Sequence, residues 1–324
     1  MAIGLPQIEI AFKQLAVTAV QRSARGIVAL IVRDTTDESF SVVEYTSVLE
    51  IEESKFTSNN VGYTKDVFTG GAAKVIVVRI GTAGTLTDAI EALGSKKYNW
   101  IGFAEGKPAD QTALVAYAKE QEKSNKKQIK AMVFNATAPD CMTVVNFTNE
   151  EVTKVGGTKI TGEKYIARLL GVFAGLSMTE SGTYYELSDL KYVKEPADVE
   201  AAIGKGQLVL FNDEETVRIA RAVNSLTTLG ADKTEDMQKI LIVETMHLIK
   251  EDVFKTFKNE YLRKYKNMYD NQVLLITAIK AYFDALEDED ILDPEFDNTC
   301  AVDVEAQRAA WLGICLLYTS DAAD

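Results

Sequence analysis

The chain has 324 residues, of which 47% are hydrophobic and 26% charged, a composition typical of a globular protein with two or three domains rather than a disordered one. Its formal net charge of −13 argues against general affinity for nucleic acid or for an anionic membrane surface. No apolar run approaches the ~20 residues of a membrane span, and no basic segment followed by an apolar one opens the chain, so we expect a protein without membrane insertion that is made in the cytoplasm.

Residues 1–25 are predicted to contain one β-strand followed by a linker. Ile8, Ile10 and Phe12 alternate with polar or small residues, which is the pattern of a half-buried strand. Residues 21–26 then have the composition of a linker. From these residues alone, the simplest interpretation is an ordinary first strand of the first sheet.

Residues 26–84 have the pattern of a small β-rich domain. Short apolar runs bounded by turn residues predict strands, and Gly70-Gly71 ends a short helix before a near-continuous apolar run. The predicted elements are strands at 27–32, 41–45, 48–51 and 74–80 and a helix at 59–68.

Residues 85–205 alternate between helical and strand patterns. Such alternation predicts a mostly parallel sheet that is covered by helices and joined by right-handed crossovers. The predicted elements are helices at 86–93, 110–125 and 163–176 and strands at 100–104, 129–134 and 142–146. The fold class is therefore α/β, within an α+β chain of several domains.

Residues 206–314 form the last predicted domain, a hairpin followed by two helices. The hairpin strands at 207–211 and 216–227 carry the apolar residues Leu208, Leu210, Val217 and Ile219. Thr234 is a candidate N-cap for a long helix that reaches residue 261, and a second amphipathic helix spans about 271–286. The acidic loop at 287–290 and Pro294 end it.

Enzymatic signatures are weak, and we predict no catalytic, cofactor-binding or metal site. His247, the single histidine, lies in the predicted C-terminal helix, so the α/β region offers no histidine base to a nucleophile. We expect it to be a partly exposed or hydrogen-bonded helix residue. Cys141 and Cys300 are far apart without CxxC spacing, which favours free thiols in a reducing compartment.

The loop from Gly81 to Gly84 is the strongest signal for the alternative, an α/β enzyme that binds a nucleotide or another small ligand. It follows a predicted buried strand and opens a helix, where backbone N–H groups can hold phosphate. The third glycine of GxGxxG is missing, and a Gly-Thr turn with Thr85 as N-cap explains the same residues.

Several long segments resemble a known family. The strings RAVNSLTTLG, KTEDMQKILIVE and YDNQVLLITAIKAYFDALEDEDILDPEFDN, followed by VDVEAQRAAWLG, are similar to the C-terminal domain of phage tail sheath proteins, in particular those of Gram-positive myophages and defective prophages. The string DVFTGGAAKVIVVRI resembles the segment that leads out of a small β domain in the same family. The family's central domain is called subtilisin-like for its topology, which implies no protease activity.

The resemblance implies a structural protein that is not an enzyme. It would polymerise with other copies of itself as a contractile sheath around the tail tube protein, with baseplate and tail terminator proteins as further partners and no nucleic acid. It would be part of the virion tail and be assembled in the bacterial host cytoplasm. The strand with Ile8, Ile10 and Phe12 would then be an arm added to a neighbouring subunit by β-augmentation. The hairpin with Leu208, Leu210, Val217 and Ile219 would be the acceptor sheet.

Residues 315–324, CLLYTSDAAD, resemble the translation of a sequencing adapter. We therefore expect the authentic sequence to stop near Ile314. Complete members of the family continue to a C-terminal strand, which would be missing here.

Overall fold

A computed structural model describes residues 20, 22, 24–124 and 127–309. They divide into two compact units. Of these residues, 24–124 and 127–251 form the first, which we call the α/β unit, and residues 20, 22 and 252–309 form the second, the C-terminal unit. None of the described helices is both long and apolar enough to cross a membrane.

The α/β unit is built on a seven-stranded sheet with the order β10-β6-β5-β4-β1-β3-β2. Every neighbouring pair is parallel except β2–β3. The interior strand β1 has the sequence IVALIVR, in which almost every residue is buried, as expected of a parallel strand covered on both faces. The strands are β1 (Ile27–Arg33), β2 (Val42–Tyr45), β3 (Lys74–Ile80), β4 (Trp100–Phe103), β5 (Lys130–Phe134), β6 (Val144–Phe147) and β10 (Gln207–Leu208).

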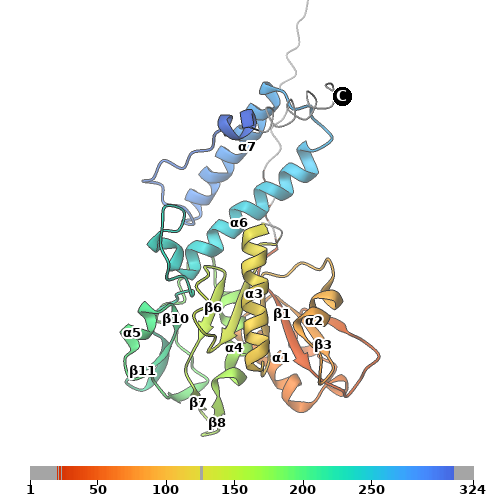
Figure 1. Ribbon diagram of the computed structural model, residues 1–324, viewed down its shortest axis with the longest axis vertical. Helices are drawn as coiled ribbons and strands as arrows, with labels where there is room; N and C mark the ends of the chain where they lie inside the picture. Colours follow the sequence, from red (N-terminus) through yellow and green to blue (C-terminus); the bar gives the residue numbers. More distant parts are fainter. Residues whose placement is uncertain (1–19, 21, 23, 125–126, 310–324) are drawn as a thin grey trace, which may run out of the picture. The chain divides into compact units, whose positions relative to one another are not determined.

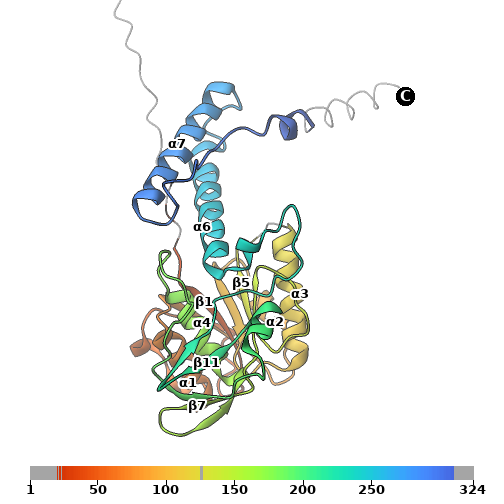
Figure 2. The same ribbon diagram turned by 90° about the vertical axis from the view of Figure 1, so that its left-hand side faces the viewer.

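Helices cover both faces of this sheet (Figures 1 and 2). Because side chains alternate along a strand, Val28 and Leu30 of β1 enter one core and Ala29 and Ile31 the other. The first core contains residues of α1 (Ser58–Gly70) and α4 (Ile166–Gly175), and the second contains residues of α2 (Leu86–Leu93) and α3 (Pro108–Ser124). The prediction of an α/β fold with a mostly parallel sheet is confirmed.

Helices α1 and α4 touch through their glycines. A Cβ atom added at Gly171 would collide with the Val67 carbonyl group and with Gly70, and one added at Gly175 would collide with the backbone of Gly71. Only glycine therefore lets these two backbones approach so closely.

Smaller elements complete the α/β unit. Strands β7 (Glu151–Lys154), β8 (Lys159–Thr161) and β9 (Leu190–Val193) form an antiparallel sheet that the sequence did not predict, with α5 (Val199–Gly204) after it. Strands β11 (Leu210–Asp213) and β12 (Thr216–Ile219) form the predicted hairpin. It is shorter than predicted: beyond Ile219 the chain turns away, and the Asn224 N–H donates to the Gln238 carbonyl instead of continuing a ladder.

Two predictions about the first half of the chain are wrong. The expected strand at 48–51 is a 3₁₀ turn, Val48–Glu50, because the Ser47 hydroxyl and the Glu50 carboxylate accept local backbone N–H groups. The expected boundary between residues 84 and 85 does not separate two sheets, because β1 pairs with both β3 and β4. Likewise, β10 carries the sheet past the expected boundary at residue 205.

The long helix α6 (Ile240–Thr256) leads into the C-terminal unit and ends in a π-helical turn, Phe257–Tyr261. Thr234 occupies the N-cap position of a short 3₁₀ turn, Glu235–Gln238, which lies just ahead of α6 and close to the predicted helix start. Helix α7 (Tyr269–Asp288) then buries Ala278, Ile279, Tyr282 and Leu286, and the Tyr282 hydroxyl donates to Asp252 at 2.8 Å. Both predicted helices are present.

Candidate functional site

The predicted acceptor residues lie in the core of the α/β unit. Leu208, Leu210, Val217 and Ile219 are each at most 1% exposed. Leu210 lies opposite Ile219 in the β11–β12 hairpin, with Val217 on the same strand as Ile219, but Leu208 belongs to β10 and pairs with Phe147 in the large sheet. The predicted arm residues Ile8, Ile10 and Phe12 lie outside the described residues.

Both outer edges of the hairpin are already occupied by the same chain. Along β12, the Leu187 N–H donates to the Val217 carbonyl at 2.9 Å and the Ile219 N–H donates to the Tyr185 carbonyl at 3.0 Å. Along β11, the Leu210 N–H donates to the Asn149 side chain at 2.7 Å. A neighbour's strand added along either edge would have to displace these bonds.

The Gly81–Gly84 loop is closed by its own cap. The Thr85 N–H donates to the Asp88 carboxylate at 2.7 Å, and the two residues form a reciprocal capping box at the start of α2. These backbone and side-chain hydrogen bonds lower the pKa of Asp88. An anion is thus already present at this helix start, where it would repel a phosphate group.

The carboxyl edge of the sheet is where α/β enzymes bind ligands, at the point where the strand order reverses, which here lies between β1 and β4. Arg33 fills this position with an ion pair to Asp110, at 2.7 and 2.8 Å. Next to it, the Asp34 carboxylate accepts N–H groups from Thr57 and Asn60, each at 2.7 Å. Arg33, Asp110 and Asp34 are therefore engaged by other groups of the chain, while the buried Nε of Arg33 has no hydrogen-bond partner in the described part of the chain.

Asp34 makes the free energy of unfolding depend on pH in the acidic range. Burial alone would raise its pKa, but the hydrogen bonds from Asn60, Thr57 and Thr36 lower it to about 2. Because the folded-state pKa is depressed, the stabilisation is complete above the unfolded value near pH 4 and is lost as the pH falls toward 2.

Asp34→Asn is expected to lower the free energy of unfolding at pH 7 by about 2 kcal/mol and to flatten its dependence on pH between 4 and 2. Urea unfolding at several pH values measures both effects, with the exposed Asp232→Asn as the control. An Asp34→Asn variant that stays as acid-sensitive as the unmodified chain would contradict this assignment.

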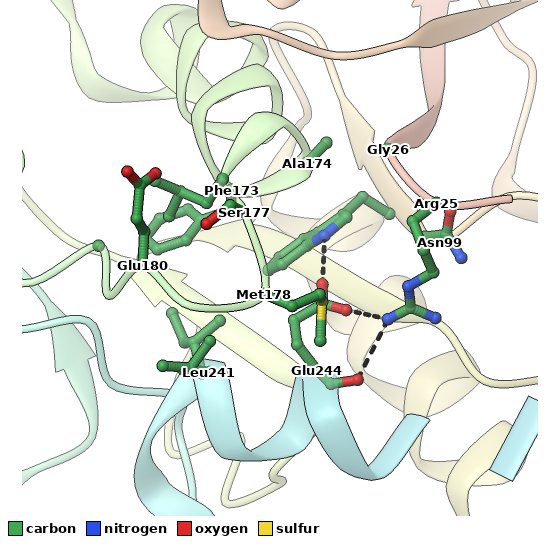
Figure 3. A pocket seen from close by; sticks show the side chains of 14 residues that line it. Arg25, Gly26, Asn99, Phe173, Ala174, Ser177, Met178, Glu180, Leu241 and Glu244 are labelled. Atoms are coloured by element: carbon green, nitrogen blue, oxygen red, sulfur yellow. Dashed lines mark hydrogen bonds and ion pairs between the residues drawn. The ribbon is translucent and has the colours of Figure 1, made fainter. Parts of the chain in front are cut away.

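A cluster of charged side chains lies at the opposite, amino edge of the sheet. Glu244 of α6 pairs with Lys130, the first residue of β5, at 2.7 Å, and also with Arg25, which precedes β1. The Trp100 indole N–H donates to Glu244 at 2.8 Å, and the Lys130 ammonium lies 5.0 Å from the Trp100 ring centroid. Figure 3 shows Arg25 and Glu244 turned toward each other beside a small cavity.

Burial governs the protonation of this cluster. It lowers the pKa of Lys130 to about 8, although Glu244 opposes the shift. For Glu244, burial alone would raise the pKa, but Lys130 and Arg25 more than offset it, so the pKa is lowered and the pair is ionised at neutral pH. His247, one turn further along α6, is 5% exposed, and burial followed by the charges of Lys130 and Arg25 holds its pKa well below the ordinary value.

The cluster positions α6 rather than a substrate. The Glu244 carboxylate is fully engaged by groups from three strands or strand ends. A second carboxylate on the same side of α6, that of Glu251 about two turns further along, pairs with Arg25 at 3.2 Å and with Lys97 at 2.9 Å. The adjoining cavity has a volume of about 30 Å³, which is room for roughly two water molecules. Among the described residues, no group of three or more potential metal ligands comes together.

Sequence reasoning missed this cluster. The signal that could have found it is Lys130 itself, a charged residue inside an apolar strand, since a lysine buried to 1% exposure requires a partner. The partner's identity was not readable, because Glu244 lies 114 positions away in the sequence.

Comparisons with known proteins point to one family. A family model described as the phage tail sheath C-terminal domain matches residues 232–316. The tail sheath protein of Clostridium phage phiCD119 is 35% identical over 315 residues, covering 94% of this chain and 86% of that protein.

Solved structures agree in fold. The sheath tail protein from Desulfitobacterium hafniense superimposes with a TM-score of 0.76 at 17% identity, covering 90% of this chain and 91% of that one. A chain of the anti-feeding prophage helical sheath in its contracted state gives a TM-score of 0.67 at 14% identity, covering 89% of this chain and 85% of that one.

Proposed function

The chain belongs to the phage tail sheath family and is a structural sheath subunit, and from this premise we propose that it polymerises around a tail tube and contracts to drive the tube through the host envelope. The observation that carries the proposal is the 35% identity to a tail sheath protein across 94% of the chain. Its partners would be further copies of itself, the tube protein, and baseplate and terminator proteins. Assembly would take place in the bacterial cytoplasm, and the product would be part of the virion tail.

The absence of catalysis is part of the same proposal. Three features support it: the Arg33–Asp110 pair fills the position where α/β enzymes bind ligands, Asp88 caps the helix start after Gly84, and His247 is buried. In each of these three positions the titratable side chain is engaged by the chain's own groups or buried.

We retain the predicted N-terminal arm but not the hairpin as its acceptor. Ile8, Ile10 and Phe12 would form a strand that a neighbouring subunit accepts, as β-augmentation requires a free sheet edge. Because both edges of the β11–β12 hairpin are occupied, the acceptor would be another strand.

Co-expression of the chain with the tube protein from the same tail tests the proposal by electron microscopy. One arm of the experiment uses the 324 residues, and a second replaces residues 315–324 with the C-terminal end of the similar tail sheath protein of Clostridium phage phiCD119. Tubular sheaths with a helical repeat are the expected result in the second arm. A protein that stays monomeric in both arms, with the tube present, would overturn the proposed function.

A further inference from the structure

The C-terminal unit exposes more large apolar side chains than the α/β unit. It carries eight of the fifteen large apolar side chains that are exposed in the described part of the chain, although it is the smaller unit. Exposed apolar side chains that gather in one region mark an interaction surface.

An apolar groove of about 500 Å³ lies in this unit. It is lined by the π-helical turn and the residues after it, by α7 up to Ile279, and by residues 300–302 and 307. Its rim carries two exposed cations, Arg263 and Lys266. Neither forms an ion pair within residues 252–309. Its apolar lining includes Phe257, Leu262, Tyr265, Leu275, Ile276 and Ile279.

The segment after α7 has the opposite character. Residues 284–297 contain eight acidic side chains and no basic one. They comprise the last residues of α7 and the loop after it, at a helix C-terminus, where negative charge is unfavourable. Phe296 lies near the end of this acidic segment, and its side chain is 74% exposed. It is flanked by Glu295 and Asp297, both exposed.

The backbone around Phe296 is held in one conformation. The Asn298 amide donates to Glu287 at 2.8 Å, to the Asp293 carbonyl at 3.1 Å and to the Phe296 carbonyl at 3.3 Å. The Glu295 N–H donates to the Asp293 carboxylate at 2.9 Å. A segment ordered before binding loses less conformational freedom when it docks.

We propose that Phe296 of one copy docks into this groove of a second copy, with Glu295 and Asp297 facing Arg263 and Lys266. The apolar anchor would fill the centre and the opposite charges would form the rim, as in specific interfaces. Phe296 does not line the groove of its own chain, although Cys300, Ala301 and Val302 do. In the proposed pairing the groove of one copy meets the loop of another, so the contact is head-to-tail and can propagate into an open polymer. The inference rests on the proposed self-assembly and names one contact within it.

Two charge-reversed variants test the contact. The groove variant carries Arg263→Glu and Lys266→Glu, and the loop variant carries Glu295→Lys and Asp297→Lys. Each variant alone should lose at least about tenfold in self-association, measured by sedimentation velocity. An equal mixture of the two should recover it, because each acidic groove then meets a basic loop and each basic groove meets an acidic loop. Phe296→Ala should weaken association in every combination.

The control variant, Lys119→Glu with Lys123→Glu on the exposed face of α3, changes the net charge by the same amount as the groove variant and should associate normally. If the groove and loop variants associate as the unmodified chain does, the contact is refuted and the proposed function stands. The contact is likewise refuted, with the proposed function left standing, if mixing the two variants restores no association. Failure of the unmodified chain to associate at any concentration, with sheaths absent in microscopy, would instead overturn the proposed function.

Discussion

Glu244→Gln is expected to lower the free energy of unfolding by about 3–5 kcal/mol, because it leaves the Lys130 ammonium buried without its counter-charge. Lys130 is 1% exposed and 2.7 Å from the Glu244 carboxylate, so solvent cannot replace the lost partner. Removing the carboxylate also removes the influence that opposes the low pKa of Lys130. Chemical denaturation followed by far-UV circular dichroism measures the loss.

The loss of stability caused by Glu244→Gln should shrink as the pH rises above neutrality. A lysine whose folded-state pKa is depressed binds fewer protons in the folded than in the unfolded chain, so stability rises with pH between the folded value and the unfolded value near 10.5. Adding Lys130→Met to Glu244→Gln should recover much of the stability, because no uncompensated charge then remains and Arg25 keeps Glu251 as its partner.

Glu151→Gln is the matched control, since it removes the carboxylate of an exposed ion pair with Lys159 and should change stability little. If Glu244→Gln costs no more than this control, the cluster does not hold α6 against the sheet.

Gly171→Ala is expected to destabilise the α/β unit by about 3 kcal/mol or more. The new methyl group would collide with the Val67 carbonyl and with Gly70, which are backbone groups of α1 that cannot rotate away. The two helices would have to separate, which opens the core on that face of the sheet. Thermal and urea unfolding measure the change.

Gly62→Ala supplies the control within the same helix pair. Gly62 lies inside α1, and nothing lies within 4 Å of a Cβ atom added there. Alanine should therefore raise helix propensity and stabilise the protein by about 0.5–1 kcal/mol. Equal effects of the two substitutions would show that α1 and α4 do not pack as closely as described.

The sequence by itself determined the elements whose signal is local. The near-continuous apolar run of β3 predicted a buried strand, and the helical periodicity of α6 and α7 predicted both helices. Thr234 marked a helical start within a few residues of the observed one, since it holds the N-cap position of the 3₁₀ turn ahead of α6, although its side chain makes no capping hydrogen bond there. The long ordered strings at the end of the chain also identified the family, which the identity to a tail sheath protein confirms.

Only the tertiary structure decided how these elements combine. Whether β3 belongs to a small domain or to the large sheet depends on its pairing with β1, which no residue within β3 encodes. The partner of Lys130 and the occupied edges of the β11–β12 hairpin likewise depend on contacts between residues far apart in the sequence. The physical reason is that hydrophobic periodicity and caps act over a few residues, whereas strand partners and buried charge pairs are selected by the packing of the whole unit.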